Sequence, residues 1–277
     1  MNTPDSKERV ALIVQYVGTN FHGWQRQPRH RSVQETIESA LQSILGHPVT
    51  LHGAGRTDSG VHAAAQVAHF DHGSSIPGNK WSKVLNSLLP IDVVITASET
   101  VKYPWHARFS AIWRRYRYTF YTDPQPNLFI SPFTWHYYHD PLDTSLMGAA
   151  LTPLKGKHHL SAFHRANSSR QHSWVDVQAV ECYRNGPFVI VEIQANGFLY
   201  GMVRLLVGML VEVGRGQRSI ANFTDIWTNE RREEVKYAAP PQGLCLLRVG
   251  YPDFPFPDSV WFDTQPLFNF RPALKQT

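Results

Sequence analysis

The stretch GAGRTDSGVHAAAQVAHF, from Gly53 to Phe70, is the part of the sequence on which the interpretation of the fold depends. It joins a glycine-flanked turn to a run of small and apolar residues typical of a strand. The turn holds one carboxylate, Asp58, two residues after Arg56. Residues two apart on an extended chain point to the same side, so Arg56 and Asp58 could flank one ligand. The simpler alternative is an Asx turn, in which the carboxylate only caps backbone N–H groups.

The segments around this stretch predict further strands and helices. Arg9–Tyr16 (RVALIVQY) is apolar and β-branched, which is typical of a strand covered on both faces. The next segment, SVQETIESALQSILG, has apolar residues at helical spacing between a capping box that begins at Ser32 and a terminating Gly46. Farther on, Arg114–Thr122 predicts a strand with an aromatic core face and a basic outer face, and Gly197–Gly214 predicts a buried helix.

Each half of the chain therefore mixes several strands with two helices, and we expect an α+β fold of two similar α/β halves. The proline-containing stretch at Tyr103–Pro104 is the expected boundary. Residues 1–104 would form the half that carries the Asp58 turn. Residues 105–277 would form the half with the basic strand, the apolar helix and a proline- and aromatic-rich tail. No low-complexity linker separates the halves, so we expect them to share one mixed, largely antiparallel sheet.

The charge balance favours an anionic partner. The 277 residues contain 27 Lys and Arg against 22 Asp and Glu, which gives a net charge of +5. The cations gather in three segments that also contain aromatic residues: Trp24–Arg31, Trp113–Tyr118 and Lys155–His172. Each segment alone is explained by solvated surface charge, but together they suit a polyanion with flat bases, such as nucleic acid.

Two further residues are unusual where they stand. Arg204 lies in the most apolar segment of the chain. A cation there is costly unless it reaches solvent along the helix edge or pairs with a distant carboxylate, for which Asp58 is the obvious partner. Tyr116 belongs to the aromatic face of the Arg114–Thr122 strand, where it is either core or a platform that stacks on an unpaired base.

Several other classes of protein lack support in the sequence. Cys182 and Cys245 form no CxxC motif and are too few for a disulfide framework, so we expect reduced thiols and a cytoplasmic protein. The N-terminus does not resemble a signal peptide, and no apolar stretch is long enough to span a membrane. The histidines lack metal-ligand spacing, so we expect no metal site. There is no phosphate loop, GxGxxG or GxSxG motif, so nucleotide hydrolysis, dinucleotide binding and the nucleophile-elbow hydrolases lack support.

At this point a family resemblance accounts for the motifs together. The chain resembles the bacterial tRNA pseudouridine synthase A family from about Ala11 to Pro252, with the motifs in the same order. The GRTD-x-GVHA element is the most specific of them. The others are YVGTNFHGWQRQ (Tyr16–Gln27), SVQETIESAL, HARFSAIWRRYRY (His106–Tyr118), GFLYGMVRLLVG and GLCLLRVGYP.

The resemblance implies a pseudouridine synthase fold with a cleft, a homodimer, no cofactor and no metal. It implies an isomerase, a tRNA pseudouridine(38-40) synthase, which converts uridines at positions 38, 39 and 40 in the anticodon arm of tRNA. By their place in the motifs, Asp58 is similar to the family's nucleophile and Arg204 to the cation paired with it. Tyr116 looks like the residue that packs on the target uracil, and Arg56 like the one that holds the flipped nucleotide out.

The sequence departs from the family pattern at two positions. Val17 stands where the opening motif usually has an acid, and Gly201 stands where a larger polar residue is common. Neither departure touches Asp58, Tyr116 or Arg204, so they put the fine-tuning of substrate binding in doubt rather than the reaction.

The implied reaction needs one carboxylate. It breaks the N1–C1′ bond, turns the uracil and joins C5 to C1′ without oxidation. Asp58 could attack C6 or C1′, or act as a base in an elimination, and the sequence leaves these three routes open. Two alternatives remain: a tRNA-binding or folding protein without catalysis, and a glycosidase, which would need a second carboxylate near Asp58.

Overall fold

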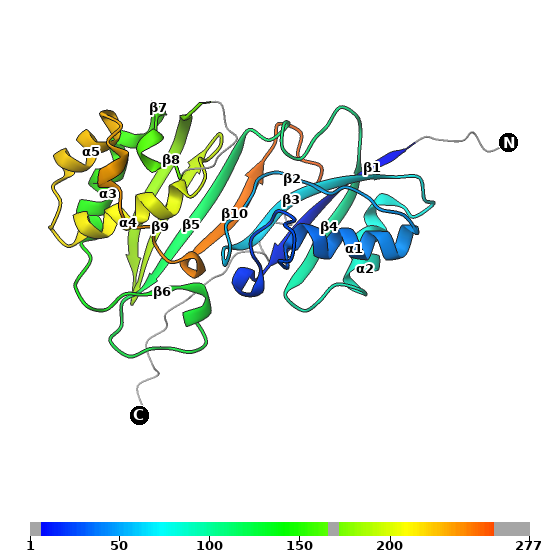
Figure 1. The fold of residues 1–277 in the computed structure, drawn as a ribbon, viewed down its shortest axis with the longest axis horizontal. Coiled ribbons are helices and arrows are strands. Elements are labelled where there is room, and N and C mark those ends of the chain that lie inside the picture. The colour runs from blue at the N-terminus through cyan, green and yellow to red at the C-terminus, as the bar shows by residue number, and fades with distance from the viewer. Residues whose placement is uncertain (1–6, 166–171, 258–277) are drawn as a thin grey trace. The chain divides into compact units, whose positions relative to one another are not determined.

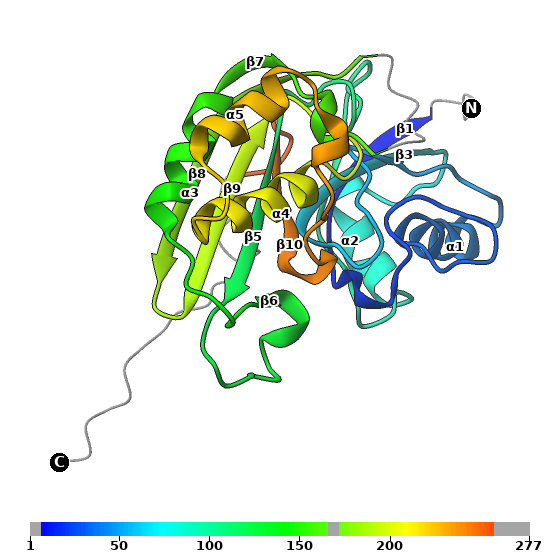
Figure 2. The same cartoon turned by 60° about the vertical axis from the view of Figure 1, so that its left-hand side comes forward.

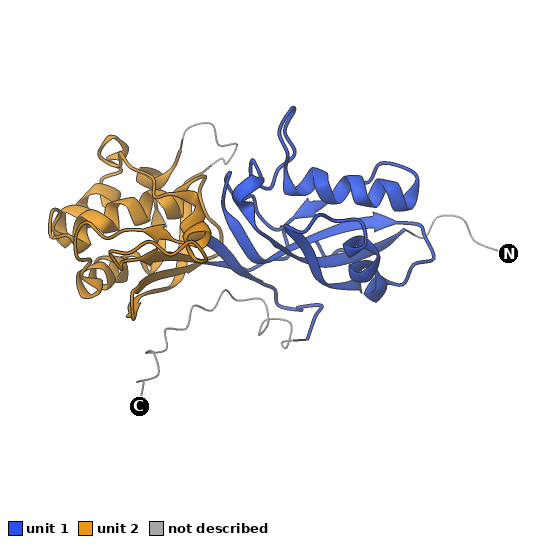
Figure 3. Cartoon of the chain, turned by 90° about the horizontal axis from the view of Figure 1, so that it is seen from below, with its two compact units in different colours: residues 1–116, 245–265 blue, residues 117–244, 266–277 orange. Residues whose placement is uncertain are grey.

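The computed structural model describes residues 7–165 and 172–257 (Figure 1). The chain divides into two compact units, coloured separately in Figure 3. Among the described residues the first unit holds 7–116 and 245–257, and the second holds the rest. The predicted halves, 1–104 and 105–277, stay a prediction. The compact units are instead divided after residue 116 and again after residue 244, where the chain returns to the first unit.

The first unit contains strands β1 to β4, the start of β5, most of β10, and two helices. Their bounds are β1 Glu8–Tyr16, α1 Val33–Leu45, β2 His52–Gly53, β3 His62–His72, α2 Trp81–Asn86, β4 Val93–Val101, β5 Trp113–Tyr121 and β10 Leu244–Gly250, with 3-10 turns η1 Gly18–Asn20 and η2 Gly78–Lys80. The strand order is β4-β1-β3-β10, and β2 pairs with Ala68 and His69 of β3. Strand β1 is antiparallel to both neighbours, whereas β10 runs parallel to β3.

The core of the first unit is formed by apolar residues of its strands. Residues Val10 to Val14 of β1 are fully buried, as expected for a strand covered on both faces. One side of β1 and β3 is covered by the described end of the chain, where Phe256 joins a core cluster with Ala11, Ile13 and Ala65. The segment after β10 is therefore part of the core of this unit. Residues after Pro257, which include most of the predicted tail, lie outside the described residues.

Helix α1 has the ends that the sequence predicts. The Ser32 hydroxyl accepts a hydrogen bond from the Glu35 amide at 3.4 Å, and Gly46 takes the left-handed conformation (φ 75°) that ends the helix. Val33, Ile37 and Leu41 form its buried face.

The second unit holds the remaining strands and the helices that cover them (Figure 2). Their bounds are β6 Trp135–His136, α3 Thr144–Leu151, β7 Gly156–His159, β8 Trp174–Asn185, β9 Phe188–Ala195, α4 Met202–Gly214 and α5 Ile220–Thr228, with 3-10 turns η3 Ser131–Phe133, η4 Thr152–Leu154, η5 Ser161–Phe163, η6 Arg232–Glu234 and η7 Pro241–Gly243. The strand order is β5-β9-β8-β7, with β7 at the edge, and α3 contacts β8, α4 and α5. Antiparallel and parallel pairs in one α+β chain confirm the predicted fold class.

Two expectations about the second unit are wrong in part. The buried helix begins at Met202 rather than Gly197, because Gly201 has a left-handed backbone (φ 71°) that does not extend an α-helix backwards. The cationic face of β5 is not simply a solvated outer side. Arg117 is 12% exposed and pairs with the buried Glu192 at 2.6 Å.

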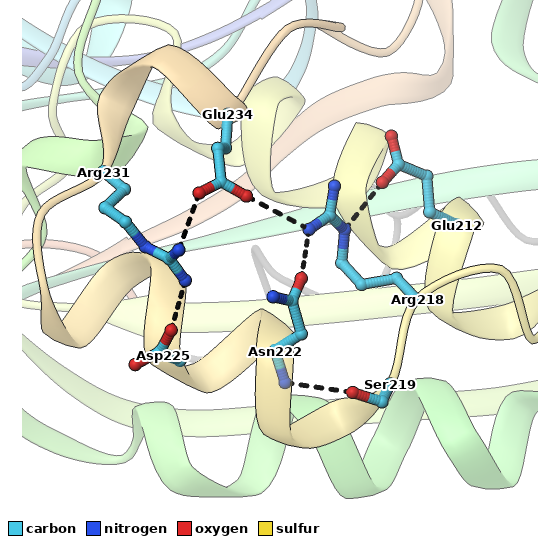
Figure 4. Close-up of polar contacts among 7 residues, drawn as sticks. All are labelled: Glu212, Arg218, Ser219, Asn222, Asp225, Arg231 and Glu234. Carbon is cyan, nitrogen blue, oxygen red and sulfur yellow. Dashed lines mark hydrogen bonds and ion pairs between the residues drawn. The ribbon is translucent and has the colours of Figure 1, made fainter.

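Ion pairs join α4, α5 and η6 at one corner of the second unit, drawn in Figure 4. Arg218 binds Glu212 at 2.7 Å, bonds Asn222 and lies 3.9 Å from Glu234. Arg231 binds Glu234 at 2.8 Å and also pairs with Asp225. We call these residues, with Ser219 at the start of α5, the α4–α5 corner.

Among the helices of residues 7–165 and 172–257, none combines the length and the apolar composition that a membrane span requires.

Candidate functional site

The turn that carries Asp58 is fixed by backbone hydrogen bonds to the segment that follows β1. The Trp24 amide donates to the Thr57 carbonyl at 3.1 Å, and the Gly60 amide donates to the Phe21 carbonyl at 3.2 Å. Within the turn, the Val61 amide donates to the Asp58 carbonyl at 3.2 Å. The backbone around Asp58 is thereby held on both sides, which suits a side chain that must be positioned.

Gly18 and Gly23 allow the segment after β1 to pack closely against the backbone of the Asp58 turn. A Cβ on Gly18 would lie 2.1 Å from the carbonyl oxygen of Val61, which no side chain tolerates. Gly23 has a left-handed backbone (φ 89°), and a Cβ there would lie 2.5 Å from the Thr57 carbonyl oxygen. These glycines belong to the YVGTNFHGWQRQ motif, so the packing of this segment against the turn explains why the motif needs them.

A buried hydroxyl pair fixes the centre of the turn. The hydroxyls of Tyr16 and Thr57 lie 2.7 Å apart, and burial raises the pKa of Tyr16. Thr57 is buried, while Arg56 is exposed and Asp58 is half-buried. Residues 56–58 lie between β2 and β3 and outside both strands, and the expectation that Arg56 and Asp58 flank one ligand stays a prediction.

Tyr116 is the predicted site residue that the structure brings to Asp58. It lies in β5 and is 8% exposed. Burial raises its pKa, and the negative charge of Asp58 raises it further. The phenol therefore stays protonated and neutral at physiological pH, and it presents an aromatic ring close to a carboxylate.

Arg114 has a role in the first unit that the sequence interpretation missed. Its Nη2 donates to the carbonyl of Ala54 at 2.9 Å and to that of Arg108 at 2.8 Å, and its Nη1 donates to that of Ala111 at 3.2 Å. Arg114 thus ties the start of β5 to the segment just before Arg56. The sequence placed Arg114 in a basic run, and nothing in that run distinguishes a guanidinium that binds carbonyls from one that binds phosphate.

Arg204 belongs to the second unit, in the first turn of α4. It is half-buried, and its Nε donates to the carbonyl of Ala239 at 2.7 Å, while the Ala239 amide donates to the Arg204 carbonyl at 2.9 Å. Burial raises the pKa of Tyr118, and the positive charge of Arg204 opposes that rise, so the guanidinium lies near this ring. The predicted pairing of Arg204 with Asp58 joins the two units and stays a prediction.

A metal centre is not built from the described residues, since nowhere in 7–165 and 172–257 do three His, Cys, Asp or Glu side chains gather closely enough to hold an ion.

Comparisons with known proteins bear on the motifs directly. A family model described as tRNA pseudouridine synthase matches residues 12–110 and 150–252. A protein from Nostoc sp. named tRNA pseudouridine synthase A is 70% identical over 96% of this chain and 95% of its own length. Proteins of the same name from Rippkaea orientalis and Synechocystis sp. are each 66% identical, over 97% and 95% of this chain and over 92% and 96% of their own lengths.

Proposed function

The chain belongs to the tRNA pseudouridine synthase family, and from that premise we propose that it isomerises uridines 38, 39 and 40 in the anticodon arm of tRNA. As a member of this family it is an isomerase that acts on tRNA. The three positions follow from the family resemblance. The observation that supports the use of an aspartate is the Asp58 turn, in which a half-buried carboxylate near a buried aromatic ring is held by backbone hydrogen bonds.

We assign Asp58 the role of nucleophile. The reaction breaks the N1–C1′ bond and forms a C5–C1′ bond; C5 loses a proton and N1 takes one up, so atoms and electrons balance without a redox partner. Attack on C6 and attack on C1′ use the carboxylate as the nucleophile, whereas an elimination would use the same carboxylate as a base. The turn supports this role because its backbone is fixed by hydrogen bonds on both sides of Asp58. A fixed nucleophile loses less freedom when the transition state forms.

Arg204 is assigned the role of keeping the nucleophile ionised. Removal of water raises the pKa of a carboxyl group, whereas a guanidinium nearby favours the charged form. Uracil detached from the sugar is an anion, and the same cation would stabilise it. Arg204 is suited to this because its Nε is occupied by Ala239, which orients the rest of the guanidinium.

Tyr116 and Arg56 are assigned to the flipped nucleotide. A uridine must leave its stack to react, at a cost of roughly a few kcal/mol. Packing on the neutral ring of Tyr116 offsets part of this cost. Arg56 is exposed next to Asp58, where it can bind the backbone phosphates of the strand from which the base has left.

The family resemblance also implies a homodimer in the cytoplasm, and we include both in the proposal. Light scattering of the purified protein on a sizing column tests the first statement. A mass of one chain at micromolar concentration would contradict it.

The test of the catalytic assignment is Asp58→Asn, measured by tritium release from tRNA labelled at C5 of uridine. We expect turnover to fall by at least about a thousandfold, while the affinity for tRNA changes less than about twofold. Asp253→Asn is the matched control, because Asp253 is an exposed aspartate of the same unit. Turnover of Asp58→Asn near that of the control would end the nucleophile assignment. A wild-type protein that binds tRNA but releases no tritium would instead favour the non-catalytic alternative.

A further inference from the structure

A pocket in the second unit lies outside everything assigned so far. It has a volume of about 570 Å³ and opens between the edge strand β7 and the end of α5, two elements that lie side by side in Figures 1 and 2. Its lining residues are Lys157, His158, His159, Trp174, Trp227, Thr228 and Glu230. We call it the β7 pocket. The pocket thus combines aromatic rings, which can stack on a flat ligand, with a lysine, which can bind an anion.

The exposed ring of the pocket is Trp174, the first residue of β8. It is 46% exposed, although leaving a tryptophan side chain in water instead of burying it costs free energy. The Lys157 ammonium lies 5.9 Å from the centroid of this ring, and the His159 ring lies 5.4 Å from it at 65°. A flat ligand that stacks on Trp174 would therefore have a cation beside it.

A hydrogen-bond network orients one imidazole at the pocket. His159 Nδ1 lies 2.7 Å from one carboxylate oxygen of Glu230, and the Ser161 hydroxyl donates to the other oxygen at 3.0 Å. A carboxylate only accepts, so Nδ1 of His159 donates the proton of this hydrogen bond. Glu230 has a left-handed backbone (φ 57°), an unusual conformation for this residue, and its two side-chain contacts help to hold it there.

The wall of the pocket holds a buried donor. Trp227 is 6% exposed, and His158 packs edge-on against it at 4.9 Å. The Trp227 Nε1–H has no hydrogen-bond acceptor among the residues that the structure describes. A buried donor without an acceptor destabilises the protein, so an acceptor on a ligand that reached it would be stabilising.

We propose that the β7 pocket binds one unpaired nucleotide of the RNA substrate, with its base stacked on Trp174 and its phosphate beside Lys157. The charges set this orientation, because the Glu230 carboxylate would repel a phosphate but accept from the N–H groups of a base. The inference rests on the proposed function for its ligand, RNA, but it concerns a subsite that takes no part in the reaction.

The test uses the full-length Asp58→Asn protein, which is expected to bind tRNA without turnover, and measures the dissociation constant for tRNA by filter binding. Adding Trp174→Ala is expected to weaken binding about tenfold, since each stacked base contributes substantially to the affinity. Trp174→Phe keeps a ring and is expected to restore most of the loss. Tyr183→Ala is the matched control, because Tyr183 is a 38% exposed aromatic on the same strand and does not line the pocket.

A second variant keeps the test decisive if Trp174→Ala does not fold. Lys157→Gln changes only an exposed side chain, and it is expected to reduce the slope of log Kd against log salt by about one. Unchanged tRNA affinity in a folded Trp174→Ala protein, or an unchanged salt slope in Lys157→Gln, would overturn the proposal. That result is distinct from failure of the proposed function, in which the wild-type protein would release no tritium at all.

Discussion

The Asp58 turn and the α4–α5 corner are both irregular connections, but they are held in opposite ways. The turn is fixed by backbone hydrogen bonds, by two glycines that allow close approach, and by the buried Tyr16–Thr57 pair. The corner is fixed by side-chain ion pairs centred on Arg218 and Arg231. Buried backbone contacts have a single geometry, whereas partly exposed ion pairs can rearrange and are screened by salt. We infer from this difference that the turn requires an accurately placed backbone, whereas the corner requires only that α4, α5 and η6 stay joined.

The largest expected effect is that of Gly18→Ala. The new Cβ would lie 2.1 Å from the Val61 carbonyl oxygen, so either the backbone must move or the turn must detach. We expect the free energy of unfolding to fall by about 3 kcal/mol in urea denaturation. Gly55→Ala is the control, since a Cβ at Gly55 has open space around it. Equal stability of the two variants would show that the turn is not held tightly.

The next effect in size is that of Tyr16→Phe. Removing this hydroxyl leaves the buried Thr57 hydroxyl without its partner, and we expect a loss of about 1.5 kcal/mol in the same measurement. The double variant Tyr16→Phe with Thr57→Val removes both partners and should recover part of that loss. Additive losses in the double variant would contradict a coupled pair.

A smaller effect is expected at the corner. The Arg218 side chain is 17% exposed, and Arg218→Ala is expected to lower the free energy of unfolding by about 1 kcal/mol in dilute buffer. In 1 M salt the difference from the wild type should shrink, because screening already weakens the pairs. The effect of Tyr16→Phe should not depend on salt. A salt-independent Arg218→Ala effect would remove the contrast between the two regions.

The smallest effect concerns pH and an ion pair in the first unit. The hydrogen bond from Arg9 lowers the pKa of Asp71, and the two groups meet at 2.7 Å. Because the folded pKa lies below the unfolded one, the pair stabilises the fold at neutral pH, and that stability is lost as pH falls below about 4. We expect Asp71→Asn to reduce the change in the free energy of unfolding between pH 5 and pH 3 by about 0.5 kcal/mol. An unchanged pH dependence would mean that this ion pair is as weakly coupled to folding as a fully solvated one.

Sequence reasoning succeeded for the first unit where local chemistry decides the structure. The ends of α1 at Ser32 and Gly46 and the doubly buried β1 are local properties, and the structure has them as predicted. The reasoning failed where a distant contact decides. Arg114 binds the Ala54 carbonyl far away in the sequence, and no local pattern distinguishes it from the arginines beside it.

In the second unit, helix α5 was missed although its signal was present. Phe223, Ile226 and Trp227 are buried at spacings of three and four, and the Ser219 hydroxyl accepts from the Asn222 amide at 3.1 Å. The helix is short and contains Asn, Thr and Asp, which have low helix propensity, so tertiary packing rather than propensity stabilises it. The start of α4 was placed too early because a left-handed glycine is indistinguishable from a helical one in the sequence.

The return of the chain to the first unit has a consequence for biosynthesis. Strand β10 completes the sheet beside β3, and Phe256 fills the core against β1, so residues 7–116 alone lack both. On the ribosome this unit cannot complete its core until residue 256 has emerged, after residues 117–244 of the second unit have been synthesised. Until then the edge of β3 that β10 will cover is available to other nascent strands, and chaperones that shield such edges would matter most at this stage.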